Sequence, residues 1–220
     1  MSIGSWRESF YGGGVRKSPA WSARNVQETQ IGNRSETPER ILDVAQTLVQ
    51  TRGYNAFSYA DIAAALHVTK ASLHYHFPSK ASLGLSLIAR YETRFRLLLD
   101  VIDARNQTAA EQITSYVAIY AGVLADHRMC MCGMLAAEFE TLPKPMQSAL
   151  DHFFGMNESW LEAVLRKGLA DASLRFADEP RSLAQFIVAA LEGAMMLARS
   201  HADESRFHAA ERRLLASLGI

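Results

Sequence analysis

The sequence predicts an all-α protein. Beyond residue 36, apolar residues recur at the spacing of amphipathic helices, and no stretch shows the alternation of a half-buried strand. Capping residues, glycines and prolines divide this pattern into segments of helical length. We therefore expect a small three-helix domain over residues 37–80, followed by a larger helical domain over residues 81–220.

Residues 1–36 are expected to form a flexible N-terminal extension. They are rich in Gly, Ser, Arg and Asn, and they show no sustained helical or strand period. Such an extension is most simply a solvated tail, although its basic side chains could also follow a phosphate backbone or enter a minor groove. Those side chains are Arg16, Lys17, Arg24 and Arg34.

The first predicted helix starts at Thr37-Pro38, where an N-cap residue precedes a proline at the first helical position. It ends at Gly53 and needs a partner for its apolar face, which the next two helices supply. The residues of that face are Ile41, Ala45, Leu48 and Val49.

The second predicted helix starts near Tyr59. Ser58 and Asp61 have the spacing of a capping box, which satisfies free N–H groups at a helix start. Its narrow apolar stripe consists of Ile62, Ala65 and Leu66. The small residues around this stripe allow a neighbouring helix to pack closely.

A tight turn at Leu66-His67-Val68 separates this helix from a third, which Thr69 caps and Pro78 must close. At about 100° per residue, Leu73 and Phe77 fall on one side of the third helix and are expected to hold it in place. The residues of the opposite, outward face are Ala71, Ser72 and Tyr75.

The outward face of the third helix has the chemistry of a DNA reader. Small side chains let the backbone approach base edges, and Tyr75 can contact a thymine methyl group or donate to a phosphate. Ser79 caps a following helix, which places Lys80 at a helix N-terminus, where a cation is unfavourable unless an anion such as a DNA phosphate lies nearby. The flanking residues are Lys70, His74 and His76.

The segment VTKASLHYHFPSK, preceded by ADIAAAL, resembles the signature of the TetR family of bacterial transcriptional repressors. The resemblance implies a double-stranded DNA operator as partner. His67 stands where the turn usually has Gly, His74 replaces the more usual Tyr, and Ala81-Ser82 replaces an acidic pair; these departures concern the operator sequence and not the binding mode. The expected DNA-contacting residues are Ser58, Tyr59, Thr69, Lys70, Ala71, Ser72, His74, Tyr75, His76 and Lys80.

Charge is distributed as expected for a DNA-binding domain attached to a body that does not bind DNA. The chain has 23 basic and 23 acidic side chains, so it is not a basic nucleic-acid binder as a whole. Residues 1–90, however, contain ten basic and six acidic side chains, against thirteen and seventeen in residues 91–220.

The larger domain is expected to contain six helices, of which the first abuts the DNA-binding domain and can act as a lever. This first helix carries an apolar stripe of Leu83, Leu87, Tyr91 and Leu98. The predicted ranges are 82–105, 108–126, 133–142, 143–170, 181–201 and 204–218.

The last two helices predict a homodimer through residues 181–218. Residues 181–201 are apolar almost all round and must be covered on more than one side, and the last helix has an apolar stripe of its own. Two such pairs can form a four-helix interface between subunits, although burial within one monomer is the alternative. The TetR resemblance, with LEGAMMLARSH in this segment, implies the dimer.

The same resemblance implies that a small-molecule inducer enters the larger domain, moves its first helix and changes the spacing of the two DNA-binding domains. Such a ligand releases DNA only if it prefers the conformation that cannot bind DNA. The candidate lining residues, most of which we expect to be simple core, are Tyr91, Phe95, Tyr116, Tyr120, Met134, Phe139, Phe153, Phe154 and Trp160.

Cys130 and Cys132 leave three hypotheses open. A thiol beside Arg128 and near a helix N-terminus could have a depressed pKa and sense oxidants or electrophiles, thereby controlling the same DNA release. Two buried, unreactive thiols are the simpler interpretation. His127 completes an H-x-x-C-x-C spacing, but no fourth ligand is identifiable, so no metal and no cofactor are expected.

Other functional classes have weaker support. An enzyme would need Cys130 or Cys132 as nucleophile and His127 or His152 as base, and nothing in the sequence orients such a pair, so we expect no catalysis. A helical interaction protein that no longer binds DNA is the remaining alternative. Two cysteines suggest a reducing compartment, no signal peptide is recognisable, and the apolar run 182–198 is too short and polar for a membrane span, so a cytoplasmic protein is expected.

Overall fold

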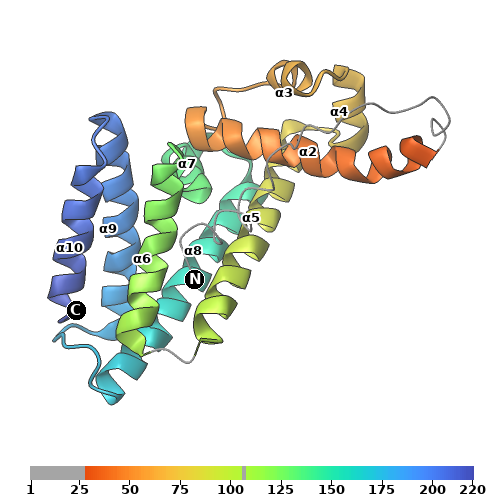
Figure 1. The fold of residues 1–220 in the computed structure, drawn as a ribbon. Helices are drawn as coiled ribbons and strands as arrows, with labels where there is room; N and C mark the ends of the chain where they lie inside the picture. Colours follow the sequence, from red (N-terminus) through yellow and green to blue (C-terminus); the bar gives the residue numbers. More distant parts are fainter. Residues whose placement is uncertain (1–27, 106–107) are drawn as a thin grey trace, which may run out of the picture.

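The computed structural model describes residues 28–105 and 108–220, with side chains from Thr37 onward. Across these residues the chain is helical and has no strand, which confirms the predicted all-α class (Figure 1). The elements are α2 (Glu28–Arg52), α3 (Tyr59–Leu66), α4 (Lys70–His76), α5 (Lys80–Asp103), α6 (Ala109–Ala125), α7 (Met131–Ala137), the 3-10 helix η1 (Phe139–Thr141), α8 (Lys144–Ala170), α9 (Pro180–Ser200) and α10 (Ser205–Ser217).

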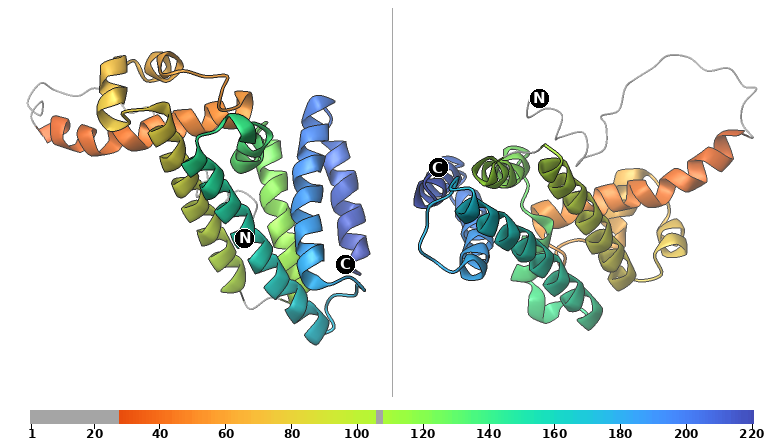
Figure 2. Two further views of the ribbon diagram at one scale, coloured as in Figure 1. Left: turned by 180° about the vertical axis from the view of Figure 1, so that it is seen from behind. Right: turned by 90° about the horizontal axis from the view of Figure 1, so that it is seen from below.

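Two parts are visible in the ribbon. Helices α5, α6, α8, α9 and α10 run alongside one another as the body, while α2 crosses one end of this bundle and carries α3 and α4 beyond it (Figures 1 and 2). Helix α9 packs against α6, α8 and α10. The head, α2 to α4, therefore lies at one end of the molecule, and α9 and α10 lie on the side of the body away from α4 (Figure 2).

The start of α2 corrects the sequence prediction. The helix begins at Glu28 and not at Thr37, so Pro38 lies inside it and residues 28–36 are not an irregular extension. A proline suits the first turn of a helix, but in the interior it removes one backbone hydrogen bond without necessarily ending the helix, so the start signal was ambiguous. Residues 1–27 lie outside the described part of the chain, as do all the basic side chains of the predicted extension.

Most other helix boundaries agree with the sequence to within two residues. Helix α2 ends as expected before Gly53, whose φ of 96° lies in the left-handed region and whose N–H donates to the Val49 carbonyl at 2.9 Å. The single helix expected over 133–142 is wrong, because the chain forms α7 and η1 with a break at Glu138. The Glu138 carboxylate instead accepts from the Asn55 backbone N–H at 2.9 Å.

The head closes around an apolar core. Ile41, Ile62 and Leu73 are fully buried, and they join α2, α3 and α4. The expected stripe on α3 needs one correction, because Ala63 is buried while Ala65 faces solvent. Helix α2 crosses α3 on the side of Ile62 and Ala63, so the narrow stripe is shifted around the helix from the predicted position.

Hydrogen bonds to backbone carbonyls join the C-terminal end of α2 to the body. The Gln50 side chain donates to the Met129 carbonyl at 2.9 Å, and the Met129 N–H donates to the Gln50 carbonyl at 3.2 Å. The Arg199 guanidinium, near the end of α9, donates to the carbonyls of Gln50 and Thr51. Arg199 thus caps carbonyls that a helix C-terminus leaves without partners, and it ties α9 directly to the head.

A second set of contacts joins the head to α5. The Arg90 side chain is largely buried and donates to Asp43 at 2.8 Å, Glu39 at 3.1 Å and the Gln46 side chain at 3.0 Å. A charged hydrogen-bond network of this kind holds α2 on the middle of α5 more firmly than an exposed ion pair would. Helix α5 therefore has the attachment that the predicted lever requires.

Helix α9 is covered on one side only within the monomer. Its inner face, including Ile187, Leu191 and Met195, is buried, whereas Phe186 and Leu197 are 57% and 56% exposed. In the described part of the chain, α9 is also the helix that is long and apolar enough to cross a membrane by length and composition alone, a test that a core helix of a soluble protein passes too.

Candidate functional site

Helices α3 and α4 start with the caps that the sequence predicted. Ser58 accepts from the Ala60 N–H at 3.2 Å, while the Asp61 carboxylate accepts from the Ser58 N–H at 2.7 Å, which completes the capping box of α3. The Thr69 hydroxyl accepts from the Ser72 N–H at 3.2 Å at the start of α4. These local bonds fix where each helix begins.

The turn between α3 and α4 depends on His67. Its φ of 55° and ψ of 43° place it in the left-handed region, as expected for a residue that replaces the more usual glycine. The Val68 N–H then donates to the Ala63 carbonyl at 3.1 Å, which closes the turn. His67 itself is exposed, so the cost of its backbone conformation is not offset by packing.

Helix α4 presents the predicted face to solvent. Leu73 is fully buried and Phe77 nearly so, while Tyr75 is 83% exposed and Ala71 is also exposed. Ser72 is half-buried on the edge of this face. The inward pair thus holds α4 against the head, and the outward residues are free to approach another molecule.

Lys70 and His74 lie beside the N-terminus of α3. Together with Ser58 and Ala60 they line a shallow pocket that Lys80 also borders. A helix N-terminus with two nearby donors or cations is suited to an anion such as a backbone phosphate. The pocket is continuous with the α4 face, so one DNA strand could contact both.

Two of the expected DNA contacts have other roles in the structure. Tyr59 is buried, and its hydroxyl donates to the Phe77 carbonyl at 2.7 Å, so it braces α3 against the end of α4 and cannot read a base. Burial raises its pKa to about 12. The His74 ring packs against it at 4.7 Å between centroids.

Lys80 does not project from its helix as the sequence suggested. Its ammonium donates to the Phe57 carbonyl at 2.5 Å and lies over the rings of Tyr54 and Phe57, at 4.7 and 4.4 Å from their centroids. Partial burial lowers its pKa. The cation at this helix N-terminus is therefore satisfied inside the head, and a phosphate contact would require its side chain to swing outward.

Comparisons with known proteins agree with this geometry. A family model described as bacterial regulatory proteins of the tetR family matches residues 41–87, and one described as a tetracyclin repressor-like C-terminal domain matches residues 109–214. The chain belongs to the TetR family. It is a DNA-binding transcriptional repressor of the TetR type, and the comparisons confirm the resemblance that the α3–α4 segment carried.

Individual TetR-family proteins align along most of the chain. A solved TetR-family regulator from Agrobacterium tumefaciens is 34% identical, with a TM-score of 0.80 over 84% of this chain and 98% of that chain. One from Legionella pneumophila is 35% identical, with a TM-score of 0.75 over 83% of this chain and 97% of that chain. The transcriptional regulator AcuR of Cereibacter sphaeroides is 29% identical over 155 residues, 67% of this chain and 69% of that protein. These relatives are regulators and not enzymes.

Seven of the nine candidate ligand residues form one aromatic cluster in the body. Phe95 is central, with ring centroids 5.4 Å from Phe153 and 6.0 Å from Tyr116. Tyr116 stacks on Trp160 at 5.5 Å and donates to the Asn157 side chain at 3.0 Å. The remaining members are Tyr91, Tyr120 and Phe154.

Met134 and Phe139 do not join this cluster. Met134 lies at the junction with the head, where its sulfur is 3.6 Å from an Arg199 nitrogen, and Phe139 is 39% exposed in η1. Met134 lies in α7 before the break at Glu138, and Phe139 follows the break. The sequence could not reveal this, because Met and aromatic spacing is the same on a core helix and at a junction.

The structure agrees with the simpler of the hypotheses for the two thiols, burial in the body. Cys130 and Cys132 are both buried, and burial, followed by the negative charge of Glu192, raises the pKa of each thiol well above its usual value. The Gly133 N–H donates to the Cys130 sulfur at 3.4 Å, but this helix N-terminus effect is outweighed. The alternative hypothesis of a depressed pKa is not supported, because desolvation dominates.

The metal and catalytic alternatives also lack a common site. The His127 side chain is 90% exposed and faces Glu204 at 3.7 Å, and the His152 ring lies on the surface 3.4 Å from Glu92. Neither imidazole is directed at the buried thiols. Within the described residues, no group of three or more His, Cys, Asp or Glu side chains is placed to hold a metal ion.

Sequence reasoning missed Glu192 as a functional candidate. Both of its carboxylate oxygens are buried without a well-formed hydrogen bond from any described residue, and burial raises its pKa to about 7. The available signal was an acidic residue in the middle of the most apolar run of the chain. That signal was used only to argue against a membrane span.

Proposed function

We propose that this TetR-family repressor binds its operator as a homodimer, with α4 of each subunit in the major groove, and that a small molecule bound in the body releases it. The observation that supports this most directly is the α4 face. Tyr75 is 83% exposed on a helix that Leu73 and Phe77 fix in place, and such a rigid, solvent-facing helix is what direct readout of bases requires.

The residues divide into two roles. Ala71, Ser72 and Tyr75 face the bases, with His74 and His76 at the margin of that surface. Phosphate contacts come from the start of α3 and the start of α4, because Lys70 and His74 of α4 lie beside the N-terminus of α3. The residues assigned to phosphate are Ser58, Thr69, Lys70 and, after rotation of its side chain, Lys80.

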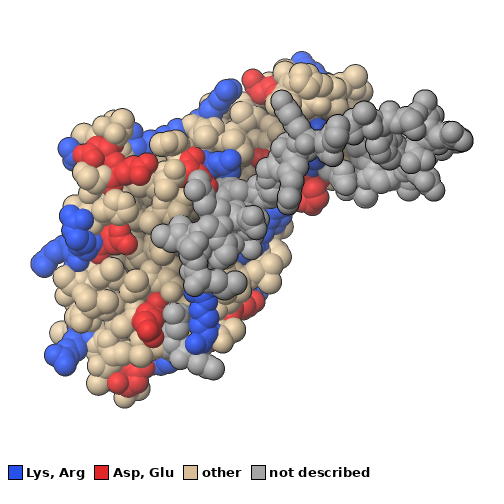
Figure 3. Space-filling view, in the orientation of Figure 1, with Lys and Arg blue, Asp and Glu red and all other residues tan. Residues whose placement is uncertain are grey.

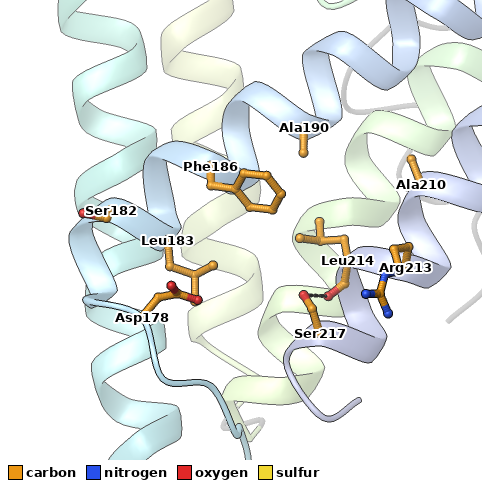
Figure 4. Close-up of a pocket in the computed structure, with 9 residues that line it drawn as sticks. All are labelled: Asp178, Ser182, Leu183, Phe186, Ala190, Ala210, Arg213, Leu214 and Ser217. Carbon is orange, nitrogen blue, oxygen red and sulfur yellow. Dashed lines mark hydrogen bonds between the residues drawn. The ribbon is translucent and has the colours of Figure 1, made fainter.

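Dimerisation uses α9 and α10, within residues 181–218. Phe186 and Leu183 project from α9 toward Ala210 and Leu214 of α10 and line an open apolar depression between the two helices (Figure 4). Phe186, together with Met196 and Leu197 further along α9, is exposed in the monomer. Burial of this surface against a second copy satisfies an apolar face that the monomer leaves open.

The charge pattern supports association through α4 and not through the whole surface. On the face of the body shown in Figure 3, Lys and Arg side chains alternate with Asp and Glu, so no large surface of one sign is present there. DNA binding therefore depends on local contacts of the head. We place the protein in the cytoplasm, where a repressor of this family meets its operator.

Release of the operator requires that a movement in the body be transmitted to the head. The aromatic cluster lies between α5, α6 and α8, and α5 is held to α2 by Arg90. A ligand that separates α5 from α6 or α8 would tilt α2 and change the distance between the two α4 helices of a dimer. Thiol sensing through Cys130 and Cys132 is the alternative route to the same release, but burial and raised pKa values disfavour it.

Fluorescence anisotropy with DNA from upstream of the protein's own gene tests the proposal. Wild type should bind in low salt, and Tyr75→Ala should weaken binding at least tenfold, because the side chain is exposed and its loss cannot disturb the core. Lys70→Ala, which removes a proposed phosphate contact, should also weaken binding. Lys144→Ala, which removes the same charge from an exposed position of the body, is its control and should bind as wild type. Equal binding by wild type and Tyr75→Ala, or no binding by either, would contradict the assignment of α4.

A further inference from the structure

Glu192 is a buried acid inside the regulatory body. It lies on α9, and its two oxygens, both inaccessible to solvent, receive no well-formed hydrogen bond from a described residue. The Cys130 thiol, a weak donor, interacts with the carboxylate and offsets only part of the desolvation. A buried carboxylate in this condition is one of the costlier arrangements a protein core can contain.

The carboxylate is packed against α7. A methyl group at Gly133 would overlap the Glu192 oxygens, so an alanine there would force the carboxylate to shift. Cys130 links the acid to the aromatic cluster, because the Tyr91 hydroxyl lies 3.8 Å from the Cys130 sulfur and the Tyr91 ring is 5.7 Å from Phe153. The acid and the rings thus belong to one continuous region between α5, α6, α7 and α9.

The electrostatics of this region have one sign. Burial raises the pKa values of Tyr116, Tyr120, Cys130 and Cys132, and the nearby charge of Glu192 raises each of them further, so all four groups lie close to the acid. None of them can carry a positive charge. The Glu192 carboxylate, with thiols and aromatic rings nearby, is complementary to an organic cation. The carboxylate attracts the cation by its charge, and the rings attract it through their faces.

We propose that Glu192 and the adjoining aromatic cluster form the effector site of this repressor, and that its ligand is a small organic ammonium compound. The proposal rests on the proposed function, since it names the chemical class of the releasing ligand. An ammonium group would donate hydrogen bonds to the two oxygens, while its apolar substituent would lie among Tyr91, Phe95 and Phe153.

Occupation of this site can reach the head by two connections. Arg199 lies two turns beyond Glu192 on α9 and donates to the last carbonyls of α2. On the other side of the acid, Met129, next to Cys130, exchanges hydrogen bonds with Gln50 of α2. A ligand that separates α9 from α7 at Glu192 therefore acts on both attachments of the same helix end.

Calorimetry with matched probes tests the proposal. Benzylammonium, n-butylammonium and tetramethylammonium are titrated into the full-length protein, with benzyl alcohol and benzoate as neutral and anionic counterparts of the first. We expect at least one ammonium compound to bind at millimolar concentration or below, and benzylammonium to bind at least tenfold more tightly than benzyl alcohol. Equal affinity for benzylammonium and benzyl alcohol, or no binding of any ammonium compound, would overturn the proposal.

Three variants locate the site. Glu192→Gln keeps the shape of the side chain and should reduce ammonium affinity at least tenfold while leaving the affinity for benzyl alcohol unchanged. Gly133→Ala, which places a methyl group against the carboxylate, should also lower the affinity for the ammonium compound. It provides a second measurement if Glu192→Gln folds poorly. Glu140→Gln, on an exposed residue of η1, should behave as wild type. Unchanged ammonium affinity in both site variants would refute the assignment to Glu192.

Operator binding distinguishes a failure of the proposed function from a failure of the effector site at Glu192. Failure of the ligand-free protein to bind operator DNA would refute the proposed function, whatever the amine results. Operator binding that the bound ammonium leaves unchanged in anisotropy would instead refute the regulatory role of Glu192 alone. Release by the ammonium in wild type and Glu140→Gln, but not in Glu192→Gln, is the expected result.

Discussion

Glu192→Gln should stabilise the folded protein at alkaline pH and much less at acid pH. Burial raises the pKa of Glu192 from its ordinary value of 4.5 to about 7. Because the folded state binds the proton more tightly than the unfolded state, the folded state is penalised as pH rises through the interval from 4.5 to 7. One pKa unit corresponds to about 1.4 kcal/mol, so the full penalty above pH 7 is about 3 kcal/mol, with less than about 1 kcal/mol at pH 5.

Urea unfolding of wild type and Glu192→Gln at pH 5 and pH 8, at one protein concentration, measures this penalty. The glutamine amide is also buried without a good partner and costs about 1–3 kcal/mol, but that cost does not change with pH. The informative quantity is therefore the change in the stability difference between the two pH values, expected at about 2–3 kcal/mol in favour of the variant. Glu140→Gln is the control on an exposed residue. An equal effect of Glu192→Gln at both pH values would show that the carboxylate is not desolvated as the structure indicates.

Other variants test separate parts of the molecule. His67→Gly should stabilise the protein by about 1 kcal/mol in the same unfolding assay, because glycine adopts the left-handed turn conformation without a Cβ penalty. Lys70→Ala should lower the slope of operator affinity against salt concentration by about 1, whereas an unchanged slope would remove Lys70 from the phosphate contacts. Phe186→Glu should convert the dimer to a monomer in light scattering and weaken operator binding, since it places a charge in the α9–α10 depression. The double variant Cys130→Ser, Cys132→Ser should respond to oxidant as wild type does when bound to DNA. If wild type responds to oxidant and the double variant does not, thiol sensing is supported and the conclusion that the buried thiols are unreactive is refuted.

Local signals in the sequence predicted the starts of α3, α4 and α5 well, because each start depends on residues only a few positions apart. Ser58, Thr69 and Ser79 each cap the helix that follows, and each cap forms with a backbone N–H two or three residues ahead. The inward positions of Leu73 and Phe77 follow from helical periodicity alone. The assignment of Tyr75 to the outward face needed nothing further.

Tertiary surroundings account for side-chain positions that the sequence did not predict. A sequence does not show that Lys80 can fold back over Tyr54 and Phe57, or that Tyr59 can reach the Phe77 carbonyl from the neighbouring helix. The thiols are the clearest case. Proximity to a helix N-terminus suggested a lowered pKa for Cys130, but its burial and the acid on α9, far away in sequence, determine the opposite.

Helix α9 explains how recognition, dimerisation and signal could be joined in one protein. Its outer face carries Phe186 and Leu197, its inner face carries Glu192, and its end carries Arg199, which is bonded to α2. A rigid helix cannot shift at Glu192 without also shifting the dimer surface and the head attachment. The buried Glu192 carboxylate destabilises the folded protein. A ligand that compensates its charge therefore stabilises a different position of α9 relative to its neighbours. The desolvation penalty at Glu192, when a bound cation relieves it, therefore supplies free energy for the movement that releases the operator.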